Sequence, residues 1–261
     1  MMAAGSMVKL VFFDIDGTLL SQRTNRVPAT TRVAVAALRR RGVRVVVATG
    51  RHPIELDAAG LDGMLFDGFA AANGQMCLDG ARRLFVGHPI PAQGVQALVS
   101  LAEQGELIWF FGEDDSYASR GDELLAQLSD ATTGLMPEVR PYDGETVYQA
   151  VAFVSVEEEP ELAAKLPGCR LQRWGAQGVD IIAADGGKVE GMKAFLTRFG
   201  CTREECMAFG DQHNDLDMLR FAGIGIAMGN GAPEVKKAAD YVTSSVDEDG
   251  VLRALEHFGL I

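Results

Sequence analysis

The sequence feature that most constrains this chain is the segment 8–20, VKLVFFDIDGTLL, in which an apolar run ends in two carboxylates two positions apart. Residues 10–13 have the pattern of a short strand buried on both faces, and Gly17-Thr18 is typical of the turn that follows such a strand. Open α/β sheets bind their ligands at the carboxyl ends of their strands. We therefore expect Asp14 and Asp16 at that edge of a central strand.

The two acids are expected to share one pocket, because side chains at i and i+2 of an extended chain project to the same side. At ~6 Å in a partly buried site their repulsion is about 3 kcal/mol at an effective dielectric near 20. A divalent cation, or a proton held on one acid, removes most of that cost. A solvated turn is the simpler explanation of an isolated DxDG pattern, so the rest of the chain has to decide between the two.

Composition sets the class of protein. A chain of 261 residues with 48% hydrophobic and 23% charged residues is an ordinary globular protein with one large or two modest domains. A net charge of −12 argues against nucleic acid and anionic membranes as general partners, because the long-range field repels both. The cysteines lack metal-binding spacing, which predicts free thiols in a reducing compartment and no structural zinc. They are Cys77, Cys169, Cys201 and Cys206.

The first seven residues, MMAAGSM, are small and have no basic segment, so we expect a disordered or tag-derived terminus rather than a signal peptide. No apolar run approaches the roughly 18 residues that a membrane span needs. The sequence thus predicts a cytoplasmic protein.

Strands and helices alternate after the first strand. A helix with Thr30 or Thr31 as its N-cap is expected to end at Gly42, and a buried strand at 43–48 follows it. Because strand–helix–strand crossovers are right-handed, Thr49 after this strand should lie at the same sheet edge as Asp14. The Thr49 hydroxyl could cap a turn or a helix, or it could bind an oxyanion.

The same alternation predicts a strand at 66–72 with a hairpin at 76–86. After an interruption, the alternation continues with a helix that follows Lys188 and ends at Gly200. A strand at 206–209 then runs into the acidic segment 210–215, GDQHND, and strands at 224–228 and 241–243 flank a helix at 233–239 before a last helix at 251–258. Acids again follow a strand, and the free N–H groups of a helix start lie beside them.

Residues 88–182 do not show this regular alternation. Helices are expected there near 91–104 and 122–129, and strands near 107–111, 147–154, 170–174 and 179–182. This mixture predicts an inserted α+β domain. The fold class is therefore α/β, a Rossmann-like parallel-sheet core with an inserted α+β cap domain.

The strand ends bring together carboxylates, a hydroxyl and a lysine. An all-oxygen ligand set fits Mg²⁺ better than zinc or copper. Around such a metal, Thr49, Lys188 and a helix N-terminus would stabilise a phosphoryl group as it transfers. One aspartate can act as nucleophile, and the other can move protons to and from the leaving oxygen.

The segments DIDGTL, the ATG turn with Thr49, Lys188 and GDQHNDLDML resemble the four motifs of the haloacid-dehalogenase-like (HAD) superfamily. The segments AMGNGAPEVKKAADYVT and DEDGV resemble the Cof-type phosphatases of its subfamily IIB. The similarity covers residues 8–80 and 185–261 and implies a hydrolase core at 8–84 and 184–261. It also implies an inserted cap at 85–183 that determines substrate specificity.

The resemblance implies that Asp14 is the nucleophile that becomes aspartyl phosphate, and that Asp16 is the general acid and then the general base. It implies a Mg²⁺ site made by Asp14, the Asp16 carbonyl and Asp211, with Asp215 in support. Lys188 is followed by Val189 where the family usually has glycine. The phosphate would be held by Thr49, Lys188, Asn214 and the backbone at Ile15 and Gly50. Candidates for substrate contacts are Arg51, Arg173, Trp174 and Asp180, whereas Asn73 and His213 are expected to be structural or rim residues.

The sequence therefore predicts a Mg²⁺-dependent phosphatase of small phosphomonoesters, such as sugar phosphates or related metabolites, that acts as a monomer or homodimer. A sugar phosphomutase on the same scaffold is an alternative, because it would use the same aspartyl phosphate. A catalytically silent phosphate-binding protein is another. A signalling receiver domain is disfavoured because its lysine would follow the last acidic motif in the sequence.

Overall fold

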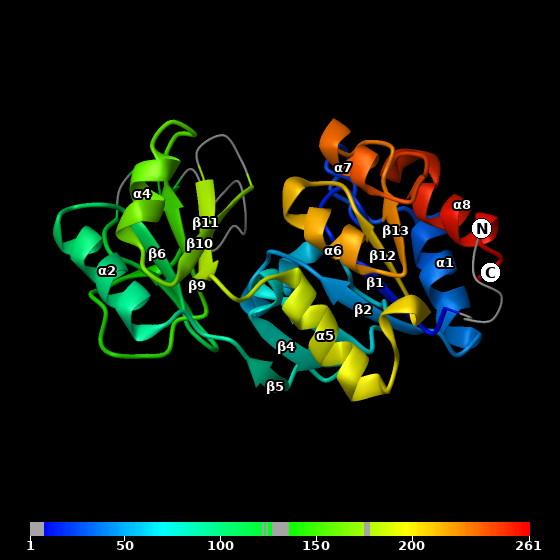
Figure 1. Ribbon diagram of the computed structural model, residues 1–261, viewed down its shortest axis with the longest axis horizontal. Coiled ribbons are helices and arrows are strands. Elements are labelled where there is room, and N and C mark those ends of the chain that lie inside the picture. The colour runs from blue at the N-terminus through cyan, green and yellow to red at the C-terminus, as the bar shows by residue number, and fades with distance from the viewer. Residues whose placement is uncertain (1–7, 122, 124, 127–135, 175–177) are drawn as a thin grey trace.

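The computed structural model describes residues 8–261 apart from 122, 124, 127–135 and 175–177, and these residues form two lobes, each built on one sheet (Figure 1). The larger sheet has the strand order β14-β13-β12-β1-β2-β3-β4-β5, and the smaller has the order β10-β11-β9-β6-β7-β8. All strands of the smaller sheet lie between β5 and α5 in the chain. This arrangement agrees with the expected insertion, and the exact domain limits stay a prediction.

The strands of the larger sheet are β1 (Leu10–Phe13), β2 (Arg44–Ala48), β3 (Gly68–Ala71), β4 (Met76–Asp79), β5 (Leu84–Gly87), β12 (Cys206–Gly210), β13 (Ile224–Ala227) and β14 (Tyr241–Val242). Its helices are α1 (Ala29–Arg40), α5 (Lys188–Phe199), α6 (Leu216–Phe221), α7 (Pro233–Ala238) and α8 (Gly250–His257). Short 3-10 helices lie at η1 (Pro53–Glu55), η2 (Asp57–Ala59), η3 (Ala72–Gly74), η4 (Arg203–Glu205), η5 (His213–Asp215) and η6 (Val246–Glu248).

The central strand β1 explains the three-layer packing of the larger lobe. It pairs in parallel with β12 on one side and β2 on the other. Side chains alternate across a strand, so Val11 and Phe13 pack with α1 and α8 on one face, and Leu10 and Phe12 pack with α5 and α6 on the other. Burying each such side chain contributes roughly 1.5–3 kcal/mol. The predicted parallel sheet is confirmed, except that β4 runs antiparallel to both of its neighbours, β3 and β5.

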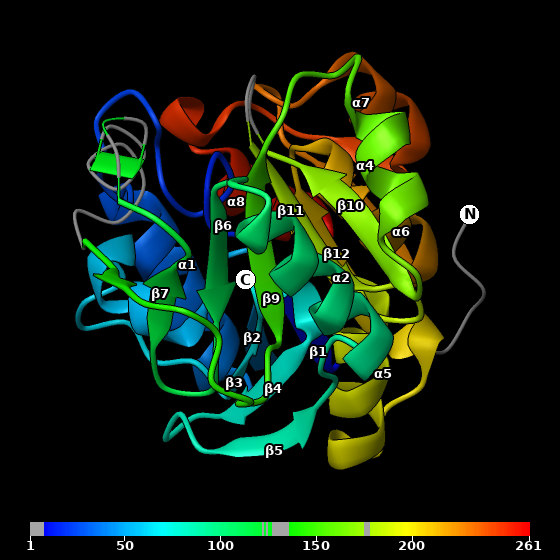
Figure 2. The ribbon, with the colours of Figure 1, turned by 90° about the vertical axis from the view of Figure 1, so that its left-hand side faces the viewer.

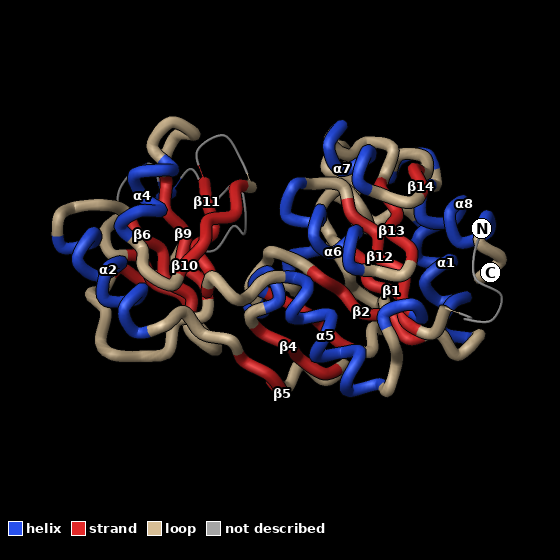
Figure 3. The backbone as a smooth tube through the Cα atoms, in the orientation of Figure 1, coloured by secondary structure: helices blue, strands red, loops and turns tan. Residues whose placement is uncertain are grey.

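Two helices of the smaller lobe cover the same face of its sheet. Its strands are β6 (Ile108–Phe111), β7 (Ser116–Ala118), β8 (Glu138–Val139), β9 (Gln149–Phe153), β10 (Cys169–Arg173) and β11 (Gly178–Ala183), and its helices include α2 (Ala92–Glu103) and α4 (Glu159–Lys165). Both helices cover the outer face (Figures 2 and 3). Val179 and Ile181 of β11 pack beneath them, so Asp180 between these residues points to the opposite face, which lies toward the larger lobe.

Three expectations need correction. Helix α1 has Pro28 at its N-cap and no side-chain cap, whereas the hydroxyl of Thr30 donates to Oδ1 of Asp249 at 2.7 Å. Lys188 is the first residue of α5 rather than a residue before it, and it is buried. The sequence analysis also missed β7 and β8, which are only three and two residues long. Most of the helix expected at 122–129 and the terminus at 1–7 lie outside the described residues.

No helix in the described part of the chain combines the length and apolar character that crossing a membrane requires. The cysteines at 77, 169, 201 and 206 are free thiols, as predicted.

Phe195 should be among the most important core residues, because it joins the helix that begins with Lys188 to the central sheet. Its buried ring contacts Phe12, Phe85 and Phe199 at centroid distances of 6.4, 5.1 and 5.7 Å. We expect Phe195→Ala to lower the free energy of unfolding by about 3–5 kcal/mol, because it leaves a cavity. Urea denaturation followed by circular dichroism measures this loss.

The control for this substitution is Val33→Ala on α1, where the side chain is 62% exposed. It should change the free energy of unfolding by less than about 0.5 kcal/mol. Equal effects of the two substitutions would contradict the packing role assigned to Phe195.

Candidate active site

The candidate site lies at the carboxyl edge of the larger sheet, where the ends of three parallel strands meet. Phe13 at the end of β1 pairs with Val47 of β2 and Phe209 of β12. The residues that follow these strands are Asp14, Thr49 and Asp211, and the structure therefore places them at one edge. The expected common edge is confirmed.

Three buried aspartates converge at this edge. Asp14, Asp211 and Asp215 each offer one carboxylate oxygen, and these oxygens lie within 4.8 Å of one another. The ammonium of Lys188 donates to Oδ1 of Asp14 at 2.7 Å and to Oδ1 of Asp215 at 2.6 Å. Lys188 is only 2% exposed, which is unusual for a lysine. One buried cation thus faces three buried carboxylates.

The electrostatics of the cluster favour an additional positive charge. Burial raises the pKa of Asp14 well above its usual range, and Lys188 offsets this only in part. Burial and the neighbouring Asp215 raise the pKa of Asp211 to about 7. Burial alone would lower the pKa of Lys188, but Asp14 and Asp215 outweigh it and raise that pKa above its ordinary value. A donor set of carboxylate oxygens, without sulfur or imidazole, fits Mg²⁺.

Asp215 holds the loop that carries Asp211. Its Oδ2 accepts from the backbone N–H groups of Asp211 and Gln212 at 2.9 and 3.0 Å, and its Oδ1 accepts from Lys188. Close approach of the backbone completes the arrangement, because a Cβ added to Gly17 would lie 2.2 Å from Oδ2 of Asp211. Gly17 also has a φ of +91°, which strongly favours glycine.

Asp16 pairs with a second cation. Both of its oxygens accept from Arg51, with Nε to Oδ2 at 2.8 Å and the terminal nitrogen to Oδ1 at 2.7 Å. This bidentate pair raises the pKa of the Arg51 guanidinium. The two acids of the DxD pattern therefore have different partners, which suits different roles.

The remaining phosphate-site candidates surround this cluster. The Thr49 hydroxyl oxygen accepts from the N–H of Arg51 at 3.1 Å, a turn cap that does not use the hydroxyl proton. The Asn214 amide donates to Oδ1 of Asn73 at 3.3 Å. A Cβ on Gly50 would lie 3.3 Å from the same Asn73 oxygen, so these groups are close neighbours. The carbonyl of Ile15 accepts from the N–H of Leu19 and belongs to the turn after β1.

The substrate candidates on the smaller lobe divide into two groups. Asp180 is buried and accepts from Nδ2 of Asn73 at 2.7 Å, and burial raises its pKa to about 7. Trp174 is 42% exposed and hydrogen-bonds to Asp180. Arg173 instead hydrogen-bonds to Glu159 of α4 and the carbonyl of Val154, so the structure does not bring it to the acids.

Sequence reasoning missed three polar partners of Asp211. The Thr18 hydroxyl donates to Oδ1 of Asp211 at 3.2 Å, and the amides of Gln212 and Asn230 donate to Oδ2 at 3.1 and 3.4 Å. All three residues lie inside segments that the sequence analysis quotes for the family resemblance. Asn230 follows β13 in a Gly-Asn-Gly turn, a signal that could have been used. His213 lies on the rim beside Glu234, as expected, with 3.6 Å between Nε2 and Oε2.

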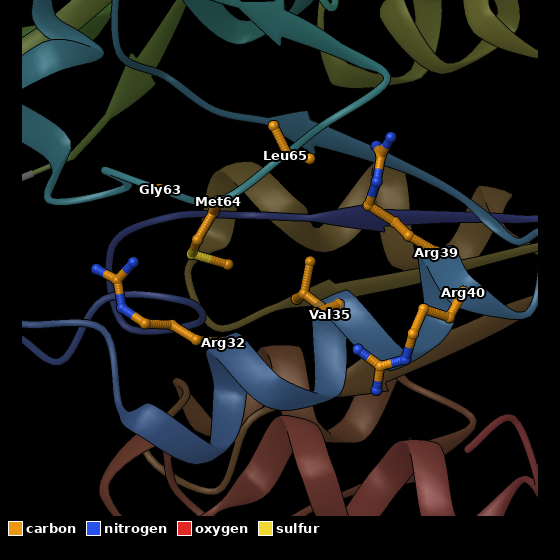
Figure 4. A pocket seen from close by; sticks show the side chains of 8 residues that line it. Arg32, Val35, Arg39, Arg40, Gly63, Met64 and Leu65 are labelled. Atoms are coloured by element: carbon orange, nitrogen blue, oxygen red, sulfur yellow. The ribbon is translucent and has the colours of Figure 1, made fainter.

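A separate pocket of about 410 Å³ lies between α1 and the loop around 63–65 (Figure 4). Three arginines of α1 line it together with Met64 and Leu65. Arg32 donates to the carbonyls of Gly60 and Asp62 at 2.7 and 2.6 Å, so it supports this loop. None of the proposed site residues lines this pocket, and it is not the candidate active site.

The sequence profile of haloacid dehalogenase-like hydrolases matches residues 11–255. YkrA of Bacillus subtilis (strain 168), provisionally named a phosphatase, is 35% identical over 258 residues, covering 97% of this chain and 98% of YkrA. A HAD phosphatase from Bacteroides thetaiotaomicron superposes with a TM-score of 0.91 at 31% identity, covering 100% of this chain and 99% of that one. A HAD subclass IIB sugar phosphatase has a TM-score of 0.90 at 33% identity, covering 97% and 100%.

The burial of Asp180 predicts a pH-dependent stability. Its pKa is about 7 in the folded protein against an ordinary value of 3.8, so the folded state binds the proton more tightly. The stability that this carboxyl contributes is present below pH 3.8 and is lost as the pH rises through 7. Asp180→Asn has no such loss, so its stability relative to wild type should increase from pH 4 to pH 8, by roughly 3–4 kcal/mol.

Thermal melts of both proteins across this pH range measure the difference. The matched control is Asp62→Asn at an exposed position, which should leave the pH dependence of the melting temperature unchanged. A constant difference between Asp180→Asn and wild type over the whole range would contradict the assignment.

Proposed function

Because this chain belongs to the haloacid dehalogenase-like hydrolases and is a phosphatase of their subclass IIB, we propose that it hydrolyses small phosphomonoesters with Mg²⁺ through an aspartyl phosphate on Asp14. The observation that carries the proposal is the buried cluster of Asp14, Asp211 and Asp215 around Lys188. Such a cluster costs stability in an ordinary core, because buried charges must be compensated. It is useful at a site that binds a divalent cation and a phosphoryl group.

Asp14 is the proposed nucleophile. A carboxylate oxygen attacks phosphorus, the bond from phosphorus to the leaving oxygen breaks, and Asp16 donates a proton to that oxygen. Asp16 then takes a proton from water as the water attacks phosphorus. The bond between phosphorus and the Asp14 oxygen breaks, which releases inorganic phosphate and restores the Asp14 carboxylate.

The carboxylates of Asp14 and Asp211 and the backbone carbonyl of Asp16 would hold Mg²⁺, and Asp215 would support the loop of Asp211. When bound, the ion would neutralise the carboxylates and the phosphoryl oxygens. Lys188 already contacts Asp14 at 2.7 Å and would place a phosphoryl group beside the nucleophile. Thr49, Asn214 and the backbone N–H groups at Ile15 and Gly50 would donate to the remaining phosphate oxygens.

Arg51 must move for Asp16 to act. It occupies both oxygens of Asp16, so it has to release one before that oxygen can approach a leaving group. A phosphorylated substrate provides an alternative anion for the guanidinium. We therefore place Arg51 among the substrate-binding residues.

The leaving group is proposed to contact the smaller lobe, which would act as a cap spanning residues 85–183. Asp180 and Trp174 are the candidate contacts, whereas Arg173 is a poorer one because Glu159 holds it. A sugar phosphate is the proposed substrate class, supported by the name of the subclass IIB sugar phosphatase. We propose a cytoplasmic enzyme with a small metabolite as partner.

The nucleophile assignment predicts that Asp14→Asn abolishes catalysis. An amide neither attacks phosphorus nor forms an acyl phosphate, so phosphate release should fall by at least about 10³-fold. Release of inorganic phosphate from a panel of sugar phosphates with Mg²⁺ measures it. Full activity in Asp14→Asn, or no turnover of any ester by the wild-type protein, would overturn the proposed function.

The metal assignment predicts a different result for Asp211→Asn. Loss of one carboxylate should raise the Mg²⁺ concentration for half-maximal activity by about 10–100-fold. A Mg²⁺ titration of phosphate release measures this shift, and Asp217→Asn on the exposed side of α6 provides a control that should leave it unchanged. An unchanged titration for Asp211→Asn would remove this residue from the ligand set.

A further inference from the structure

Asn73 lies in an unusual turn. The three residues of η3, Ala72, Asn73 and Gly74, all have positive φ angles, of +50°, +53° and +85°. The left-handed region costs of order 1 kcal/mol or more for residues with a Cβ, and such strain persists only where the surroundings impose it. Two consecutive non-glycine residues in this region therefore call for an explanation.

The surroundings of the turn are parts of the proposed phosphate site. The N–H groups of Ala72 and Asn73 donate to the carbonyls of Arg51 and Thr49, both at 2.8 Å. On its other side Gly74 abuts the start of α5, because a Cβ there would lie 2.4 Å from the carbonyl oxygen of Gly187. The turn is thus clamped between the Thr49 loop and the helix that begins with Lys188.

The side chain of Asn73 links the two lobes. It is fully buried, and its Nδ2 donates to Oδ2 of Asp180 on β11 at 2.7 Å. Its Oδ1 accepts from Nδ2 of Asn214 on η5 at 3.3 Å. One amide therefore connects a carboxylate of the smaller sheet to a proposed phosphate ligand of the larger lobe.

The order of donors and acceptors along this chain is fixed at one end. Asp180 accepts from the NH₂ group of Asn73, with 2.7 Å between Nδ2 and Oδ2. The carbonyl oxygen of Asn73 must then face Asn214, and because this oxygen only accepts, Asn214 must present its own NH₂ group. The second N–H of that group remains available for another acceptor.

We propose that Asn73 is a positioning residue that transmits the contact with Asp180 to Asn214, so that the Asn214 amide presents an N–H rather than a carbonyl oxygen to phosphate. The reversed amide would place an oxygen against a phosphate anion. This inference rests on the proposed function, since it assumes that Asn214 binds the phosphate. It links docking of the smaller lobe to the arrangement of the phosphate site.

A purely structural role for Asn73 makes a different prediction, because asparagine is also common in left-handed turns. Asn73→Gly separates the two roles, since glycine accepts the backbone conformation and removes only the side chain. Asn73→Asp keeps the shape but loses the donor to Asp180. The matched control is Asn25→Gly, because Asn25 is exposed and has a similar φ of +51°.

The test is a double-mutant cycle on the full chain with Mg²⁺, read out as the inhibition constant of inorganic phosphate and as kcat/KM for an ester that the wild type hydrolyses. Asn73→Gly and Asn214→Ala should each weaken phosphate inhibition and lower kcat/KM by about tenfold, the scale of one hydrogen bond to a charged group. If Asn73 acts through Asn214, the double variant should be no worse than Asn214→Ala alone. Asp180→Ala should weaken inhibition in the same direction, and Asn25→Gly should change neither value.

Two results would overturn the positioning role while the proposed function stands. One is an unchanged phosphate inhibition constant in Asn73→Gly, and the other is a double variant whose loss is the product of the single losses, about a hundredfold. A wild-type protein that releases no phosphate would instead overturn the proposed function. Melting temperatures of all variants identify any that lose activity through unfolding.

Discussion

The candidate site depends on a cluster of buried ions whose charges are only partly balanced, because one buried lysine faces three buried aspartates. Transferring each of these charges from water costs several kcal/mol, and Lys188 offsets only part of that cost because it contacts two of the acids. Burial, together with the remaining excess of negative charge, keeps the pKa of Asp14 and Asp211 high. The buried negative charge therefore lowers the stability of the folded protein, and a bound divalent cation would restore part of that stability.

The apolar layers of the larger lobe make that cost tolerable. Asp14 and Asp211 each follow a strand whose side chains alternate between two packed faces, so these strand ends are held in place by the cores on both sides of the sheet. The backbone must also approach the acids closely. Gly17 and Gly210 permit this, since a Cβ on either would meet the side chain of Asp211 or Asp215 at 2.2 and 2.5 Å. Packing and glycine positions thus bring the charges closer together than their repulsion alone would allow.

Polar contacts join the two lobes near the site. Nε2 of His52 hydrogen-bonds to the carbonyl of Gly112 on the smaller lobe at 2.9 Å, and burial lowers the pKa of His52 to about 4, so the ring is neutral at physiological pH. Together with the bond between Asn73 and Asp180, this contact fixes how the smaller sheet faces the acids. The faces of the two lobes carry side chains from distant parts of the chain, which explains how residue 180 can contact residue 73.

The alternation of strands and helices, the positions of the acids after β1 and β12, and the family could all be predicted from the sequence, because apolar periodicity and short motifs are local properties. The partners of those acids could not be predicted in this way. Such contacts join residues far apart in the chain. Examples are the contacts that bury Lys188, the pair of Asp16 with Arg51, and the hydrogen bond from Arg173 to Glu159. Thr18 and Asn230 were missed as partners of Asp211 for the same reason. Local pattern can place a residue at a sheet edge, but only tertiary packing decides which charges lose water and which hydrogen bonds replace it.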